Sequence, residues 1–72
     1  MRFKDRVREA RLAAGLTQSL AAQRVGVTPW AWYHWESGRR TPPIKTAQRI
    51  ATVLNVPIGW LLGDNQSREE VS

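Results

Sequence analysis

Glycine and proline interrupt this 72-residue chain so often that any regular element it forms must be short. The interruptions are Gly15, Gly26, Gly38, Pro42, Pro43, Pro57 and Gly63. Between them, apolar residues recur three or four positions apart, as they do along one face of a helix. No segment alternates apolar and polar residues in the way a half-buried strand does. The pattern predicts an all-α fold made of five short helices.

The expected helices cover about residues 3–14, 17–25, 29–37, 44–54 and 57–62. Thr17 and Thr28 stand where a hydroxyl can cap the second and third helices, and Pro29 fits the first position of the third. We expect residues 1–63 to form one domain. Residues 64–72, DNQSREEVS, are polar, and we expect them to be a disordered tail.

The apolar residues of these helices predict one small core. Its expected members are Val7, Ala22, Val25, Trp32, Trp35, Ile50, Leu54 and Leu61. Ala14 and Ile44 continue the apolar stripes of the first and fourth helices, so we expect them to face inward as well.

Basic residues dominate the expected domain, whereas the tail is acidic. Residues 1–63 hold ten Lys and Arg against three Asp and Glu, a balance of +7, and residues 64–72 have a balance of −2. A domain this basic attracts polyanions, with nucleic acid first and anionic membrane surfaces second. No apolar run approaches the ~20 residues of a membrane span and no signal-peptide core is present, so we expect a cytoplasmic protein that does not enter a membrane.

The chain offers few groups for metal binding or catalysis. It has one histidine and no cysteine, so the usual nitrogen and sulfur donors provide no set of metal ligands. Its scattered serines and few acidic residues form no catalytic triad or carboxylate pair. We therefore expect neither a metal, nor a cofactor, nor an enzymatic activity.

The stretch TPWAWYHWESG, residues 28–38, gathers three of the four tryptophans with the only tyrosine and the only histidine. On a helix of about 100° per residue, one half of the circle carries Ala31, Trp32, Trp35 and Glu36, and the other half carries Pro29, Trp30, Tyr33 and His34. The first half is expected to anchor the core. The second half leaves aromatic side chains exposed beside arginines, which is typical of a surface that reads nucleic acid and also of a surface that binds a protein.

Glu36 is the polar member of the inward half of this helix. A buried carboxylate needs a partner, and Arg11 on the first helix is the candidate. The alternative is a carboxylate at the rim of the core, surrounded by water.

From Val7 to Leu62 the chain resembles the Cro/phage-repressor helix-turn-helix family, also called Xre-like. The matching stretches are RVREARLAAGLTQ, AQRVGVT, WESGRRTP and RIATVLNVPIGWLLG, in the order and spacing of the family. The resemblance implies a compact five-helix domain of the lambda-repressor type. In that fold the second and third helices bind DNA, and the third lies in the major groove.

The resemblance also implies roles for individual residues. The expected base-reading residues are Pro29, Trp30, Tyr33 and His34. The expected contacts to the DNA backbone are Gln18, Thr28, Ser37, Arg39, Arg40 and Lys45. A buried pair of Arg11 and Glu36 is implied, and a dimer contact formed by Val56, Pro57, Ile58 and Trp60. For Trp60 the alternative is a partly buried cap on the fifth helix.

Three departures from the family pattern are evident. Ala21 stands where a larger aliphatic residue is usual and Leu20 where a polar one is usual, so either the second helix is rotated or Trp32 fills the gap. The base-reading positions lack the usual Gln, Asn, Ser or Arg. Gly59 weakens the fifth helix by up to ~1 kcal/mol.

We therefore expect a sequence-specific regulator of transcription, of the Cro or repressor type and of phage, prophage or bacterial origin. It would bind double-stranded DNA at a near-palindromic operator as a homodimer, formed in free solution or only on DNA. The alternatives are a module whose aromatic face binds a protein, an antitoxin-type regulator, and the N-terminal domain of a longer repressor.

Overall fold

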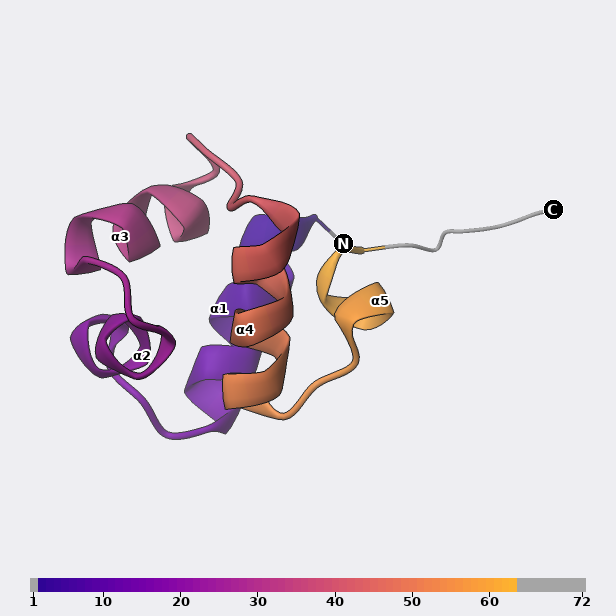
Figure 1. The fold of residues 1–72 in the computed structure, drawn as a ribbon, viewed down its shortest axis with the longest axis horizontal. Helices are drawn as coiled ribbons and strands as arrows, with labels where there is room; N and C mark the ends of the chain where they lie inside the picture. The colour runs from indigo at the N-terminus through magenta and orange to yellow at the C-terminus, as the bar shows by residue number, and fades with distance from the viewer. Residues whose placement is uncertain (1, 64–72) are drawn as a thin grey trace, which may run out of the picture.

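Five α-helices account for most of residues 2–63, the part of the chain that this computed structural model describes (Figure 1). They are α1 (Phe3–Ala13), α2 (Gln18–Val25), α3 (Pro29–Ser37), α4 (Ile44–Leu54) and α5 (Ile58–Leu61). Residues 2–63 contain no strand. The expected all-α fold is therefore confirmed, and the helix ends lie within one or two residues of those expected. The tail expected at residues 64–72 lies outside the described residues.

The helix ends follow from local chemistry. The hydroxyl oxygen of Thr17 accepts a hydrogen bond from the backbone N–H of Leu20 at 3.1 Å, and Thr28 caps α3 in the same way through Ala31 at 3.1 Å. At the other end of α3, Gly38 adopts φ +83°, a left-handed conformation that costs a glycine little. The short turn between α2 and α3 lies between Gly26, which ends α2 with φ +89°, and Thr28, which caps α3.

The helices are arranged so that α2 and α3 lie on one side of the molecule and α5 on the other, with α1 and α4 between them (Figure 1). α3 packs against α2 and α1, while α5 packs against α4 and α1. This arrangement leaves the outer surface of α3 uncovered.

The core contains every one of the eight residues expected there. All eight are buried, and Trp32, Ile50, Leu61 and Val7 are the largest side chains that are fully buried.

The expectations for Ala14 and Ile44 are wrong, because both side chains are exposed. Ala14 follows the last residue of α1 as its C-cap, so the helical stripe has already ended. Ile44 is the first residue of α4, and its side chain, 56% exposed, lines a shallow apolar groove with Phe3, Pro42 and Leu62 instead of entering the core.

The departure at Leu20 and Ala21 does not rotate α2 so as to bury the leucine. Ala21 is fully buried, whereas Leu20 remains 43% exposed. The small side chain of Ala21 belongs to the same core cluster as the indole of Trp32. Both residues therefore contribute to the one core of the domain.

Candidate nucleic-acid interface

The carboxylate of Glu36 joins three helices. Arg11 Nε donates to Glu36 Oε2 at 2.6 Å, and Arg11 Nη2 donates to Oε1 at 3.2 Å. Gln18 Nε2 donates to Oε1 at 3.1 Å, and the indole N–H of Trp32 donates to Oε2. The Glu36 side chain is only 5% exposed. A buried carboxylate is stable here because four donors satisfy its two oxygens.

The same network extends to the loop between α1 and α2. Arg11 Nη1 donates to the backbone oxygen of Leu16 at 2.8 Å. The guanidinium therefore fixes the loop as well as α3, and the bidentate geometry makes this a strong form of ion pair. Arg11 thus ties α1 to α3 and to the loop that leads into α2.

The pKa of Glu36 reflects the balance of these effects. Burial raises it, but the hydrogen bonds from Arg11, Trp32 and Gln18, together with the charge of Arg11, outweigh burial. The result is a pKa below the ordinary value of 4.5. The carboxylate is therefore ionised at neutral pH.

Sequence reasoning named Arg11 as a partner of Glu36 but missed Trp32 and Gln18. The spacing of Trp32 and Glu36, four residues apart on one helix, places their side chains on the same face and is a signal that could have been used. Gln18 gives no such signal, because its approach depends on how α2 packs against α3.

The outward half of α3 carries the residues expected to read bases. Pro29, Trp30 and Tyr33 are exposed, with Trp30 at 62% and Tyr33 at 53%. His34 is half-buried between the two aromatic rings: its ring centroid lies 4.0 Å from that of Trp30 and 5.7 Å from that of Tyr33. The three rings form one surface, which we call the α3 aromatic face.

The two nitrogens of the His34 ring differ in environment. Nδ1 is buried and has no hydrogen-bond partner. Unpaired buried N–H groups are rarer than unpaired acceptors, so the neutral ring is best assigned with its proton on the more accessible Nε2. His34 then offers a donor at the surface.

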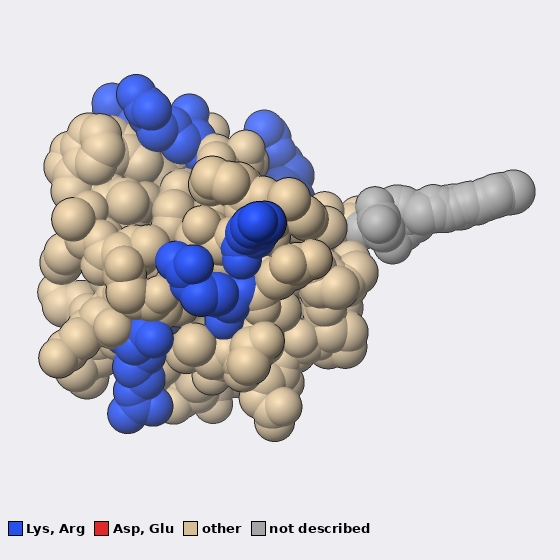
Figure 2. Space-filling model, viewed as in Figure 1, with Lys and Arg blue, Asp and Glu red and all other residues tan. Residues whose placement is uncertain are grey.

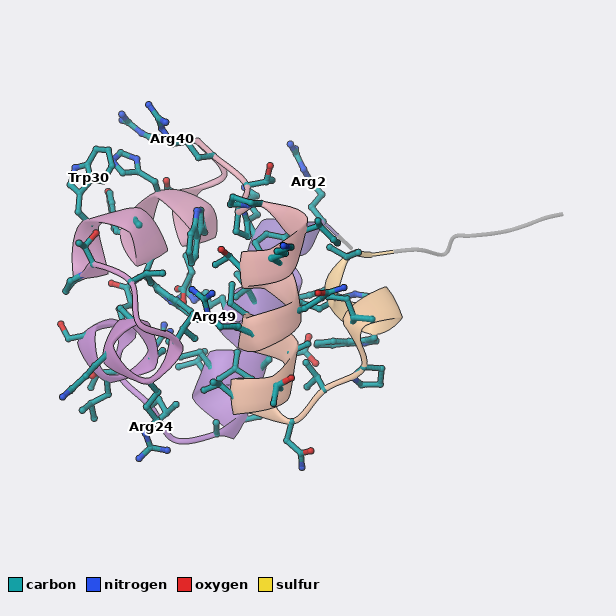
Figure 3. All side chains as sticks on the ribbon, in the orientation of Figure 1. Arg2, Arg24, Trp30, Arg40 and Arg49 are labelled. Atoms are coloured by element: carbon teal, nitrogen blue, oxygen red, sulfur yellow. The ribbon has the colours of Figure 1, made fainter. Side chains whose placement is uncertain are left out.

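The loop after α3 adds positive charge beside the aromatic face. Arg39 and Arg40 are exposed, and the Arg40 guanidinium lies 5.9 Å from the centroid of the Trp30 ring. Figure 3 shows Trp30 and Arg40 projecting from the same edge of the molecule, with Arg2 farther along it. An arginine over an indole face is a favourable cation–π arrangement.

The other residues expected to contact the DNA backbone differ in whether a side-chain donor is free to reach a phosphate. Thr28 is exposed, and although its oxygen caps α3 its hydroxyl hydrogen can still be donated. Lys45 is exposed on α4, beside Arg49. Gln18 uses one amide hydrogen on Glu36, and Ser37 donates its hydroxyl hydrogen to the backbone oxygen of His34 at 3.1 Å. Ser37 therefore cannot donate to a phosphate without breaking that bond.

Two further cations, Arg2 and Lys4, lie beside the α3–α4 loop. Sequence reasoning did not single them out. The aliphatic stem of Lys4 packs over Gly38, where an added Cβ would lie 2.9 Å from Lys4 Cδ. Arg2 and Lys4 line a small cavity of about 80 Å³ with Arg40 and Thr41. The start of α1 thus extends the basic surface beyond the loop.

The region expected to form a dimer surrounds α5. Val56, Ile58 and Trp60 are half-buried and pack on the core, while Pro57 is exposed. The first three residues of this region, 56–58, line a groove of about 570 Å³ along α4. Arg6 Nη1 donates to the backbone oxygen of Trp60 at 2.6 Å, and the Arg6 guanidinium lies 4.9 Å from the Trp60 ring centroid. Arg6 therefore holds α5 against α1.

Within residues 2–63, no three His, Cys, Asp or Glu side chains gather where they could hold a metal ion. None of the described helices has the length and the apolar character that crossing a bilayer requires.

A family model described as helix-turn-helix matches residues 7–61. The matched range begins in α1, contains α2, the turn and α3, and ends with α5. The chain belongs to the helix-turn-helix family. The resemblance inferred from the sequence is thereby confirmed.

Several curated proteins are similar to this chain. The cryptic phage CTXphi transcriptional repressor RstR of Vibrio cholerae is 28% identical over 65 residues, which are 90% of this chain and 59% of that protein. The uncharacterized HTH-type transcriptional regulator YqaE of Bacillus subtilis (strain 168) is 33% identical over 69 residues, 96% of this chain and 59% of that protein. An uncharacterized HTH-type transcriptional regulator of Methanothermobacter thermautotrophicus is 46% identical over 48 residues, 67% of this chain and 70% of that protein. The chain spans less than two thirds of the first two relatives.

Proposed function

We propose that this chain is a sequence-specific, double-stranded DNA-binding regulator of transcription, acting as a repressor of the phage or prophage type. The observation that carries the proposal is the outward half of α3. Exposed aromatic side chains lie there, on a helix whose inward half is fixed by Glu36, and Arg40 of the following loop lies beside Trp30. The names of the relatives, which are transcriptional regulators and a phage repressor, support the same conclusion.

In the proposed complex, α3 lies in the major groove and the α3 aromatic face meets the base edges. Pro29 and Trp30 would pack against apolar groups, and His34 would donate to an acceptor on a purine, most simply guanine. Tyr33 lies beside them and can contribute its hydroxyl. Specificity would thus depend on aromatic contacts where Gln, Asn or Arg are more usual.

The DNA backbone would be bound on both sides of the groove. Thr28, Arg39, Arg40 and Lys45 have exposed groups that can donate to phosphates, and Gln18 retains a second amide hydrogen. The free backbone N–H groups in the first turn of α2 also favour an anion. Because each phosphate contact releases counterions, affinity would fall steeply as salt rises.

One domain of this size reads too few base pairs for useful selectivity, so we propose a two-fold dimer on a near-palindromic operator. Two half-sites would then lie about one helical turn apart. Val56, Pro57, Ile58 and Trp60 are the proposed contact, because the first three line the groove beside α5 and Trp60 lies on α5 itself, partly exposed. The Trp60 ring face near Arg6 is already used within one subunit, so the groove side of α5 is the better contact.

The test is selection of binding sites from random-sequence duplex DNA at near-physiological salt. We expect an enriched inverted repeat with a half-site spacing near one helical turn. Enrichment of a single half-site would contradict the dimer. Absence of any enriched sequence, with only salt-sensitive background binding, would contradict specific recognition and favour a protein as the partner of the α3 aromatic face.

A further inference from the structure

We propose that the α3 aromatic face recognises the C5-methyl group of a pyrimidine in the major groove, so that thymine and 5-methylcytosine are accepted alike at that position. This inference rests on the proposed function, because it assumes that α3 enters the major groove. It adds the chemical feature that is read and predicts a response to DNA methylation.

The start of α3 presents an apolar surface at the position expected to meet the bases. Pro29 has no backbone N–H, and the indole of Trp30 is 62% exposed with most of its area apolar. In the major groove the C5-methyl group of thymine is the apolar feature of the base edges, and the remaining groups are hydrogen-bond donors and acceptors. 5-Methylcytosine carries a methyl group on the same ring carbon. A large apolar side chain facing this groove therefore selects for that methyl group.

The indole of Trp30 is held in position before any ligand arrives. The His34 ring packs against it at an interplanar angle of 67°, with 4.0 Å between the ring centroids, and the Arg40 guanidinium lies 5.9 Å from its centroid (Figure 3). A side chain restrained on two sides loses less conformational freedom on binding than a free one. The exposed apolar area is thus available at a reduced entropic cost.

In this proposal, His34 donates a hydrogen bond to a purine close to the methylated pyrimidine. His34 follows Trp30 by four residues, and 4.0 Å separates the two ring centroids, so the two side chains would reach the same base pair or neighbouring ones. With the proton assigned to Nε2, His34 donates to an acceptor, such as N7 or O6 of guanine. The expected pattern is a methyl group on one base pair and a purine acceptor close to it.

The experiment compares operators that differ only in methyl groups. Each thymine of the selected half-site is replaced in turn by uracil, which keeps the base-pairing edge and O4 but lacks the methyl group. We expect about fourfold weaker binding at one or two positions, the effect of exposing one methyl-sized group. A hydrogen bond from the indole N–H to O4 would survive this replacement, so the experiment separates the two kinds of contact.

The second arm restores the methyl group on a different base. At a sensitive position, a thymine–adenine pair is replaced by cytosine–guanine and then by 5-methylcytosine–guanine. We expect the methylated pair to bind about fourfold more tightly than the unmethylated one.

Protein variants show which residue makes the contact. Trp30→Ala should bind thymine and uracil operators equally, whereas Trp30→Phe, which keeps an apolar ring without the N–H, should retain the difference. Leu12→Ala is the control, because Leu12 is an exposed apolar side chain on α1, outside the α3 aromatic face, and should leave the uracil effect unchanged. Comparing the thymine-to-uracil effect between the parent protein and each variant also cancels any effect of uracil on DNA flexibility, because that effect is common to all the proteins.

The outcomes separate the inference from the function on which it rests. Equal affinity for uracil and thymine operators at every position would overturn the methyl contact while leaving specific DNA binding intact. A uracil effect that persists in Trp30→Ala would overturn the assignment of the methyl contact to Trp30. Failure to bind any duplex selectively would instead contradict the proposed function itself.

Discussion

Glu36 shows how one residue can determine the geometry of a small domain. Its carboxylate accepts hydrogen bonds from Arg11, Gln18 and Trp32, which belong to three different helices. Removing one partner of such a pair is costly because the other buried groups lose their counterpart. The stability of the domain and the orientation of α3 therefore depend on the same side chain.

Glu36→Gln should lower the free energy of unfolding by about 1–3 kcal/mol, because the amide cannot accept all four bonds and leaves the Arg11 charge unpaired. Denaturant unfolding of the two proteins measures the difference. Glu9→Gln is the matched control, since Glu9 is exposed on α1 and should change stability little. Equal midpoints for Glu36→Gln and the parent protein would contradict the network.

The lowered pKa of Glu36 predicts how stability depends on pH. A carboxylate whose folded-state pKa lies below its unfolded value contributes stability above the unfolded pKa and loses that contribution as pH falls through the folded pKa. The loss should begin near the ordinary value of 4.5 and continue at lower pH. Thermal melts between pH 7 and pH 3 should show a smaller decrease for Glu36→Gln than for the parent protein, and parallel curves would refute the shift.

Among the helices, α5 has the least intrinsic stability. It has four residues, Ile58–Leu61, and no side chain caps its N-terminus. Leu61 anchors it in the core, and the Arg6 guanidinium binds the backbone oxygen of Trp60 near its end. α5 is thus maintained by tertiary contacts more than by its own sequence.

Gly59→Ala should stabilise the domain by about 0.5–1 kcal/mol, because alanine restricts the unfolded chain and favours the helix. A Cβ at this position would meet no atom within 4 Å. Thermal unfolding gives the measurement. The same change at Gly38, where the backbone has φ +83° and Lys4 lies close, should destabilise; a loss of stability at Gly59 would show that α5 needs the glycine.

Helix ends were predictable because threonine caps, glycines and prolines act within a few residues of the chain. The exposure of Ile44 was not predictable, since this first residue of α4 projects beyond the core, and neither was the hydrogen bond from Ser37 to the backbone oxygen of His34. Hydrogen bonds made across helices, such as that of Gln18, depend on packing that no local pattern encodes. The DNA contacts expected from the resemblance remain predictions.

At the scale of the whole molecule, positive charge is spread over several helices. Figure 2 shows Lys and Arg side chains distributed over the face in view, with no acidic side chain visible there. Figure 3 shows Arg2 and Arg40 at one edge of this face and Arg24 at the opposite edge. Only the charges near α3 and its loop should contribute to a tight complex with DNA.

Arg2→Gln should weaken operator binding and reduce the slope of log affinity against log salt by about 0.9, the effect of one lost phosphate contact. Binding measured by anisotropy at several salt concentrations tests this. Arg24→Gln has the same charge change at the opposite edge and should leave the slope nearly unchanged. Equal slopes for all three proteins would mean that the start of α1 does not reach the DNA.

The division of α3 into two halves has a consequence for how such proteins diverge. Trp32 and Glu36 hold the helix in place, whereas Trp30 and Tyr33 face away from the domain. A duplicated gene can therefore acquire new outward residues while its product still folds. Several descendants with one architecture could coexist in a single cell, each controlling its own promoters without interfering with the others.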